Sequence, residues 1–127
     1  MKTYVEEVQH YPSSSGSPFS EAVRVGNMLY LAGQVGTDTT GKLAQGGIGP
    51  ETEQAMTNIA AVLKKCGSSM SDVVEVTVAL IDINDWPAMN TAYSRFFKKH
   101  YPARTAYAVK DLVMDARVEI TCKAVVR

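Results

Sequence analysis

The chain has 127 residues, and its thirteen basic and thirteen acidic side chains give a formal net charge of zero. Hydrophobic residues make up 46% of it, enough for one packed core, so we expect a single domain over residues 1–127. The balanced charge argues against electrostatic capture of nucleic acid, and no apolar run is long enough to span a membrane. A neutral domain also lacks the charge repulsion that opposes self-association.

The cysteine and histidine pattern predicts no metal site. Cys66 and Cys122 have no metal-binding spacing, and His10 and His100 lie far apart in the chain. Free thiols fit a reducing compartment, and the start at Met1 leads into a strand-like alternation, not a signal peptide. We therefore expect a cytoplasmic protein.

The first third of the chain predicts strands joined by turns. Residues 3–10 alternate as a strand does, and the Ser, Gly and Pro content of residues 11–18 predicts a loop, either a connector or a lid over a site. Strands at 22–25 and 28–35 follow, joined by a tight hairpin turn at Gly26-Asn27.

Within the 28–35 strand, strict alternation places Leu29, Leu31, Gly33 and Val35 on one face. A glycine inside a strand marks a bulge, a close approach of a ligand or backbone, or a simple accommodation of twist. The sequence leaves these alternatives open for Gly33.

A polar, glycine-rich loop at 37–49 precedes the first helix, which begins near Pro50, runs through Lys65 and ends at Gly67 as its C′ residue. Residues 73–81 predict the next strand. Its alternation places Val74, Val76, Val78 and Leu80 toward the helices. The opposite face is too apolar for simple exposure to water, which predicts burial against another subunit.

A second helix follows, capped by Asn84 or Asp85, with Pro87 in its first turn and an end at His100 to Pro102. Its apolar stripe predicts the side that packs on the sheet; the stripe comprises Trp86, Met89, Tyr93, Phe96 and Phe97. Asn90 lies one residue round from this stripe, and the pattern alone favours a surface amide.

Arg104 lies in the next predicted strand, after Pro102, among small alanines. Its planar guanidinium is free to bind a carboxylate through two parallel hydrogen bonds, although the strand alone favours an ordinary surface or interface charge. The last strand, 117–126, places Glu119 on a polar face, which favours a solvated side chain.

The predicted order is β-β-β-α-β-α-β-β, an α+β domain with both helices on one side of a sheet of six strands. The sheet face opposite the helices is partly apolar, and oligomerisation would bury it.

The chain also resembles the YjgF/Rid family of reactive enamine/imine deaminases, from residue 17 to its end. No single motif carries this resemblance, but several short segments together match the family in their order and spacing. The matching segments are Ser17 to Val23, Ala32-Gly33-Gln34, Gly46-Gly47-Ile48, Gly67 to Val74, Asn84-Asp85-Trp86, Asn90 with Tyr93 and Phe96-Phe97, Pro102-Ala103-Arg104, and Val118-Glu119-Ile120.

The resemblance implies a chorismate-mutase-like fold with a mixed sheet, assembled as a homotrimer with clefts between subunits. It implies hydrolysis of 2-enamine and 2-imine acids such as 2-aminoacrylate to 2-keto acids and ammonia, with no metal or cofactor. Arg104 would bind the substrate carboxylate, and Glu119 would position water or move protons. Phe19, Gly33, Asn90 and Ala106 would complete the substrate pocket.

The sequence departs from the family pattern at three of these places. Phe19 stands where a tyrosine is common, Ala32 where a serine is common, and Ala106 where a cysteine is common. These changes make the predicted pocket less polar. They motivate an alternative in which the same trimer binds small carboxylates without turnover, as a regulator or chaperone-like protein. A ribonuclease, another activity described for relatives, fits the zero net charge least.

Overall fold

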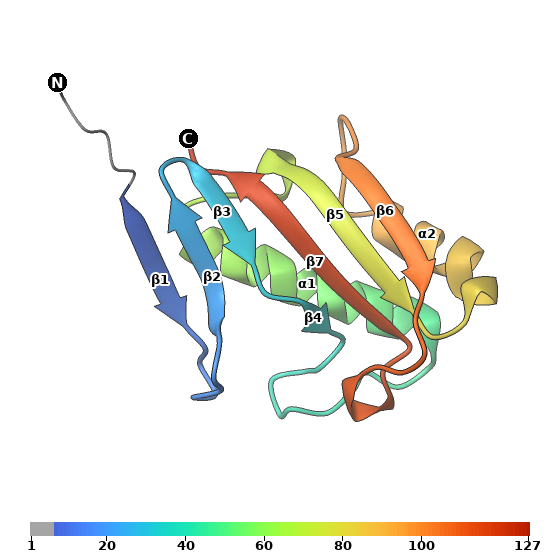
Figure 1. Ribbon diagram of the computed structural model, residues 1–127. Coiled ribbons are helices and arrows are strands. Elements are labelled where there is room, and N and C mark those ends of the chain that lie inside the picture. The colour runs from blue at the N-terminus through green and yellow to red at the C-terminus, as the bar shows by residue number, and fades with distance from the viewer. Residues whose placement is uncertain (1–6) are drawn as a thin grey trace, which may run out of the picture.

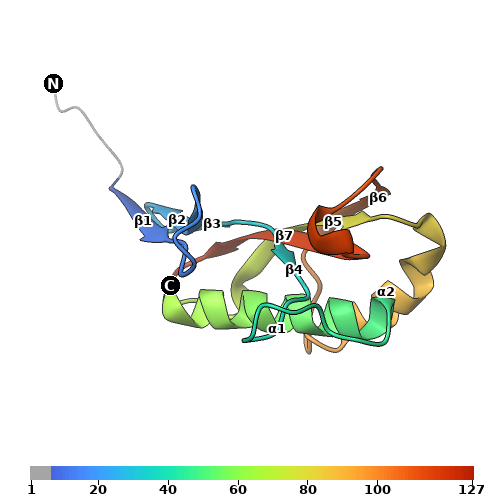
Figure 2. The ribbon, with the colours of Figure 1, turned by 90° about the horizontal axis from the view of Figure 1, so that it is seen from below.

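The computed structural model describes residues 7–127 (Figure 1). In this part of the chain seven strands form one sheet, in the order β1-β2-β3-β7-β5-β6, with β4 also paired to β7. The strands are β1 (Val8–Pro12), β2 (Ser20–Val25), β3 (Met28–Leu31), β4 (Gln34–Val35), β5 (Val73–Leu80), β6 (Ala103–Ala108) and β7 (Val118–Val125). The helices α1 (Ile48–Lys65) and α2 (Trp86–Ser94) lie on the same side of the sheet (Figure 2). The predicted α+β architecture is confirmed.

The sheet is mixed, because β5 pairs with β6 in parallel while every other described pairing is antiparallel. The antiparallel β7 lies at the centre between β3 and β5, and β6 forms one edge of the sheet. This order leaves one long side of β6 without a strand partner among residues 7–127, and such an edge is able to pair with or pack against another chain.

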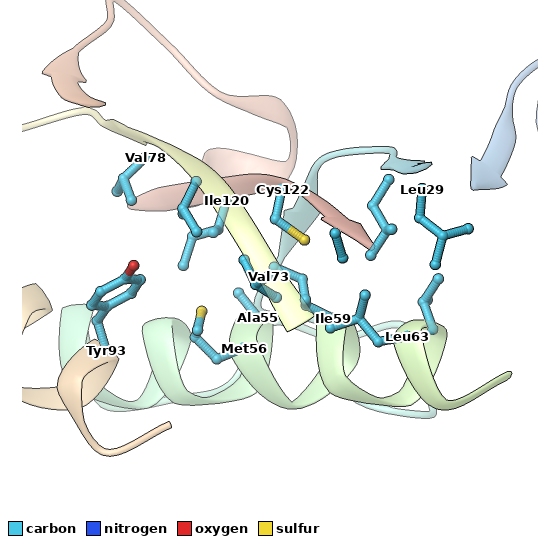
Figure 3. Close-up of a cluster of buried hydrophobic side chains, with 14 of the residues drawn as sticks. Leu29, Ala55, Met56, Ile59, Leu63, Val73, Val78, Tyr93, Ile120 and Cys122 are labelled. Carbon is cyan, nitrogen blue, oxygen red and sulfur yellow. The ribbon is translucent and has the colours of Figure 1, made fainter. Parts of the chain in front are cut away.

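The core lies between the sheet and α1, with α2 at one end (Figure 3). The apolar stripe of α1 faces the inward side chains of β7 and β5, as its spacing predicts. Burying each of these large aliphatic side chains stabilises the fold by about 1.5–3 kcal/mol. The largest fully buried side chains are Leu29, Met56, Ile59, Leu63, Leu80, Met89 and Ile120.

Helix α1 ends as predicted but begins earlier. Gly67 has a φ of +80°, and the Ser68 N–H donates to the Leu63 carbonyl at 2.8 Å, which closes the C-terminal turn. The helix begins at Ile48, before Pro50. Glu51, in its first turn, is buried, and its Oε1 accepts a hydrogen bond at 2.9 Å from the N–H of Arg117, which ties the helix start to the residue before β7.

The first two strands differ from their predicted bounds. Of the predicted strand at 3–10, residues 3–6 lie outside the described residues, and β1 runs on through Tyr11 and Pro12. These two residues, predicted as loop, pair with Ala22 and Ser20, so β2 also begins earlier than predicted. The pairing between the two strands therefore determines where β1 ends and β2 begins, and the local composition does not indicate this pairing.

The single predicted strand at 28–35 is interrupted by a bulge. Tyr30 pairs with Lys123, but Gln34 pairs with Ile120, so three residues of this segment lie opposite two of β7. The strict alternation is therefore wrong beyond Leu31, and the bulge alternative for Gly33 is confirmed.

The predicted faces of β5 need one correction. Val76, Val78 and Leu80 are buried as predicted, but Val74 is 42% exposed and Val73 is buried in its place. A register shift between Val73 and Glu75 reverses the alternation at this end of the strand. In contrast, the predicted faces of β7 are confirmed, with Val118, Ile120, Cys122 and Ala124 all buried.

Helix α2 is shorter than predicted. It ends at Ser94, so Phe96 and Phe97 pack against the core from the segment after the helix. Pro87 lies in the first turn and Asp85 is the N-cap residue, both as predicted, but the Asp85 side chain makes no capping hydrogen bond. The Asp85 carboxylate instead accepts from the Arg117 guanidinium at 2.7 Å. Among residues 7–127, neither helix combines the length and hydropathy needed to cross a membrane.

Candidate functional site

Arg104 occupies the edge strand β6 and points toward the helix side of the sheet. It pairs with Val76, a residue of the buried face, and its guanidinium lies along α2, from Trp86 at the start of the helix to Tyr93 near its end. The guanidinium carbon lies 4.8 Å from the ring centroid of Tyr93 and 5.2 Å from that of Trp86. Contacts of this kind, between a cation and aromatic faces, hold the charge without neutralising it.

No carboxylate neutralises this arginine within residues 7–127. Its one hydrogen-bond contact there is from Nη1 to the sulfur of Met89, at 3.8 Å. A half-buried guanidinium with five donors and one weak sulfur acceptor retains most of its capacity to bind an anion. The sequence pattern predicts Trp86, Met89 and Tyr93 as core residues; the structure shows that they also form the cradle of Arg104.

The guanidinium faces a hollow of about 260 Å³ at the end of the molecule that carries α2. The hollow is lined by Asn90, Tyr93, Ser94, Tyr101, Pro102 and Arg104. We call it the Arg104 hollow. It unites two predicted site residues, Arg104 and Asn90, and the buried Oδ1 of Asn90 has no hydrogen-bond partner within the described chain. Ala106, also predicted, lies two residues along β6 and packs partly against the core.

Tyr93 also carries a buried hydroxyl without a partner among the described residues. Burial raises the pKa of this hydroxyl to about 12, although the nearby Arg104 charge acts in the opposite direction. The phenol therefore stays neutral at physiological pH, so the ring beneath Arg104 does not supply a competing anion.

Glu119 lies on the other side of the sheet. It pairs with Ala79 and with Val35 of β4, on the face away from the helices. Within residues 7–127 the Glu119 carboxylate forms no ion pair. The neighbouring bulge leaves room for it. A Cβ on Gly33 would lie 3.0 Å from the Glu119 carboxyl carbon and 3.1 Å from the Thr121 hydroxyl.

Glu119 opens into a hollow of about 740 Å³, which we call the Glu119 hollow. Phe19 and Gly33, both predicted site residues, line it with Glu119, and so do three serines of the predicted 11–18 loop. That loop is therefore a rim of the hollow and not only a connector. The remaining lining residues are Glu21, Ala32, Gln34, Val35, Thr37, Asp38, Thr39, Gly41, Val113 and Met114.

Apolar side chains around the Glu119 hollow are unusually exposed. Phe19 is 56% exposed, Val113 64% and Met114 52%. Met114 and the following Asp115 adopt positive φ angles, of 61° and 54°, which side chains other than glycine rarely do. Sequence reasoning missed Val113 and Met114, because nothing in their local composition indicates a strained turn over the sheet.

The predicted site residues thus form two groups within one chain. Arg104, Asn90 and Ala106 belong to the helix side and the β6 edge, whereas Phe19, Gly33 and Glu119 belong to the open face. The two hollows share no lining residue. Residues 7–127 contain no group of three or more His, Cys, Asp or Glu side chains placed to bind a metal ion.

These features define a class: an α+β protein with one mixed sheet, two helices on one face, and an unneutralised arginine at the sheet edge. A model of the family described as endoribonuclease L-PSP matches residues 9–126. The chain belongs to this family, which is the YjgF/Rid family, as the resemblance of its motifs predicts.

Named relatives and solved structures agree with this assignment. The chain is 44% identical over 115 residues to a Capra hircus protein named 2-iminobutanoate/2-iminopropanoate deaminase, covering 90% of this chain and 83% of that protein. It is 41% identical over 109 residues to the Homo sapiens protein of the same name, covering 85% and 80%. The structure of RidA from an Antarctic Psychrobacter superposes with a TM-score of 0.84 at 32% identity, covering 98% and 100%. A Thermotoga maritima protein gives a TM-score of 0.85 at 40% identity, covering 100% and 99%.

Proposed function

We propose that this protein is an enamine/imine deaminase that hydrolyses 2-imino acids, with their 2-enamine tautomers, to 2-keto acids and ammonia. The observation that carries the proposal is the Arg104 guanidinium, held by two aromatic rings and a thioether and left without a carboxylate partner in residues 7–127. The relatives named as 2-iminobutanoate/2-iminopropanoate deaminases support the same substrate class and favour turnover over binding alone.

The chemistry requires few protein groups. Arg104 binds the substrate carboxylate through two parallel hydrogen bonds, which fixes the position of the adjacent imine carbon. Water adds to that carbon while the imine nitrogen takes up a proton, and the resulting carbinolamine releases ammonia to leave the keto group. Glu119 positions the water and transfers protons between the oxygen and the nitrogen. Asn90 and the backbone at Ala106 orient the substrate beside Arg104.

We further propose that the site forms between subunits of a homotrimer. In one chain Arg104 and Glu119 face opposite sides of the sheet, so neither hollow alone contains both groups. The free edge of β6 and the exposed Phe19, Val113 and Met114 support burial of these surfaces against another copy. Stacking the Arg104 hollow of one subunit on the Glu119 hollow of the next would complete three equivalent clefts.

A cytoplasmic location is part of the same proposal, supported by two cysteines that are both free and buried. On this proposal, the protein binds a small 2-imino acid as its substrate and two further copies of its own chain.

A coupled assay tests the proposed activity. A pyridoxal-phosphate dehydratase generates 2-iminobutanoate from threonine, and the rate of 2-ketobutanoate release is followed with and without this protein. We expect acceleration by the wild type, and a loss on the order of 100-fold in Arg104→Ala, because a bidentate charged contact and the orientation it gives are both removed. Arg95→Ala, which removes an exposed arginine outside the hollow, is the matched control. Full activity in Arg104→Ala would overturn the proposal.

A further inference from the structure

A third hollow lies between the short 3-10 turn at Met70–Asp72 and the segment that follows α2. Its volume is about 430 Å³, within the range of small-molecule pockets. It is lined by Ser69, Met70, Ser71, Phe96, Phe97, Lys98, Lys99 and His100, and we call it the Phe97 hollow. It shares no lining residue with the Arg104 hollow or the Glu119 hollow. The proposed deaminase chemistry therefore does not account for it.

The floor of the Phe97 hollow is apolar and firmly supported. Met70, Phe96 and Phe97 are partly buried and pack against the hydrophobic core. The Phe97 ring lies 5.0 Å from that of Tyr93 and 5.9 Å from that of Tyr101, in tilted contacts typical of stable aromatic pairs. Such a floor presents a fixed apolar surface to a ligand.

The rim, in contrast, is basic. Lys98, Lys99 and His100 are exposed and consecutive, and neither lysine forms an ion pair within the described residues. No acidic side chain lines the hollow. The nearest acidic residue in sequence, Asp72, is engaged by Arg127 at 2.8 Å and by the Ser69 hydroxyl at 3.0 Å. A chain of zero net charge thus concentrates unneutralised positive charge beside an apolar floor.

We propose that the Phe97 hollow binds a small organic anion with an apolar body, of the class of aryl or medium-chain alkyl carboxylates and phosphates. The body lies on Phe96, Phe97 and Met70, where its burial contributes through the hydrophobic effect. The anionic head lies at Lys98 and Lys99, which supply charged hydrogen bonds, with the Ser71 hydroxyl beside them. A short-chain 2-imino acid lacks the apolar body, so this hollow is not a second copy of the proposed substrate site.

Isothermal titration calorimetry with four probes tests the proposal on the wild-type protein. Octanoate and octyl phosphate carry both the body and the head, octanol lacks the charge, and acetate lacks the body. We expect saturable binding of one or both charged octyl probes, with octanol and acetate at least ~10-fold weaker, because each lacks one of the two contributions. The two charged octyl probes distinguish a carboxylate head from a phosphate head.

Variants locate the bound probe. Lys98→Gln combined with Lys99→Gln should weaken binding by about 10-fold, since two charged hydrogen-bond donors are lost. Lys42→Gln combined with Lys110→Gln removes the same charge from exposed lysines elsewhere and should leave binding unchanged. Arg104→Ala should also leave binding unchanged, so failure here is distinguishable from failure of the proposed deaminase function.

Three results would overturn the proposal: no saturable binding of either charged octyl probe, undiminished binding in the Lys98/Lys99 double variant, or displacement of the probe by 2-ketobutanoate. The last result would place the probe in the Arg104 hollow instead.

Discussion

Arg104 and Glu119 lie on opposite faces of one sheet, with β5 between their two strands. Side chains that diverge in this way cannot act on one small substrate within a single chain. If both act on the same molecule, each must meet its counterpart from a neighbouring subunit.

Complementation between two inactive variants tests this relationship. The Arg104→Ala and Glu119→Gln variants should each lose most of the activity on their own. When the two are unfolded together and refolded as a mixture, about a quarter of the clefts should combine an intact arginine with an intact glutamate from different subunits. The deaminase assay of the mixture should therefore recover on the order of a quarter of the wild-type rate. A mixture no more active than its components would contradict a shared cleft.

Gly33→Ala should impair turnover while the fold persists. The added methyl group would lie 3.0 Å from the Glu119 carboxyl carbon, so this side chain must shift by a few tenths of an ångström. A shift of this size in the proposed catalytic group should lower kcat by up to roughly 10-fold, with less effect on binding of the substrate carboxylate, which we assign to Arg104. Steady-state kinetics with thermal unfolding distinguishes this from a loss of folding.

Gly49→Ala is the matched control for that substitution. Gly49 lies in the first turn of α1, and a Cβ there meets no atom within 4 Å. We expect wild-type kinetics from this variant, because alanine is also favoured in helices. An unchanged kcat in Gly33→Ala would show that the position of Glu119 does not limit the reaction.

Trp86 should report the occupation of the Arg104 hollow. It is the only tryptophan of the chain, and its ring centroid lies 5.2 Å from the guanidinium carbon. Binding of 2-ketobutanoate should change its fluorescence saturably in the wild type but not in Arg104→Ala. A signal that persists in Arg104→Ala would mean that the carboxylate binds elsewhere.

Trp86→Leu should weaken substrate binding more than it slows chemistry. Loss of one cation–π contact, of about 0.5–2 kcal/mol, leaves the guanidinium less well positioned, so KM should rise by at most roughly 30-fold. Trp86→Phe keeps an aromatic face and should restore most of the affinity. If leucine and phenylalanine behave alike, the ring does not position Arg104.

The unfolding free energy should fall as pH rises above 9. Burial raises the pKa of the Cys122 thiol from 9.0 to about 12, and the pKa of Tyr93 from 10.0 to about 12. The unfolded chain releases these protons first, so the folded state binds more protons between pH 9 and 12 and loses stability there. Each group contributes a slope of up to about 1.4 kcal/mol per pH unit.

Urea unfolding between pH 7 and pH 10.5 measures this slope. Cys122→Ala should be less stable at pH 7 but should show a shallower decline with pH than the wild type. Parallel pH profiles for the two proteins would show that the thiol ionises equally easily in the folded and unfolded states.

The fold was largely predictable because its elements carry local signals. The period of α1, its Gly67 end and the alternation of β7 follow from the order of residues alone. The predicted bounds and faces are wrong where strand pairing or packing against another element determines the local structure. The bulges beside Gly33 and Val74 depend on the register with β7, and the early end of α2 depends on how Phe96 and Phe97 reach the core.

The candidate site was less predictable from the residues themselves. Alternation alone favours a surface charge at Arg104 and a solvated side chain at Glu119, and only the family resemblance implies their roles. Period and polarity do not reveal that Trp86 and Tyr93 enclose the guanidinium, because a core aromatic and a cation-binding aromatic have the same spacing. The strained turn at Met114 has no composition signal either.

The bulge at Ala32-Gly33 has a consequence for insertions and deletions. Three residues there oppose two of β7, so removing one residue would bring β3 and β4 into a single continuous ladder. The sheet itself would tolerate that deletion, but Gly33 would no longer lie next to the Glu119 side chain. A deletion of one residue at this point should therefore keep the sheet but change the surroundings of Glu119. Homologous chains that differ in length here should differ in activity before they differ in architecture.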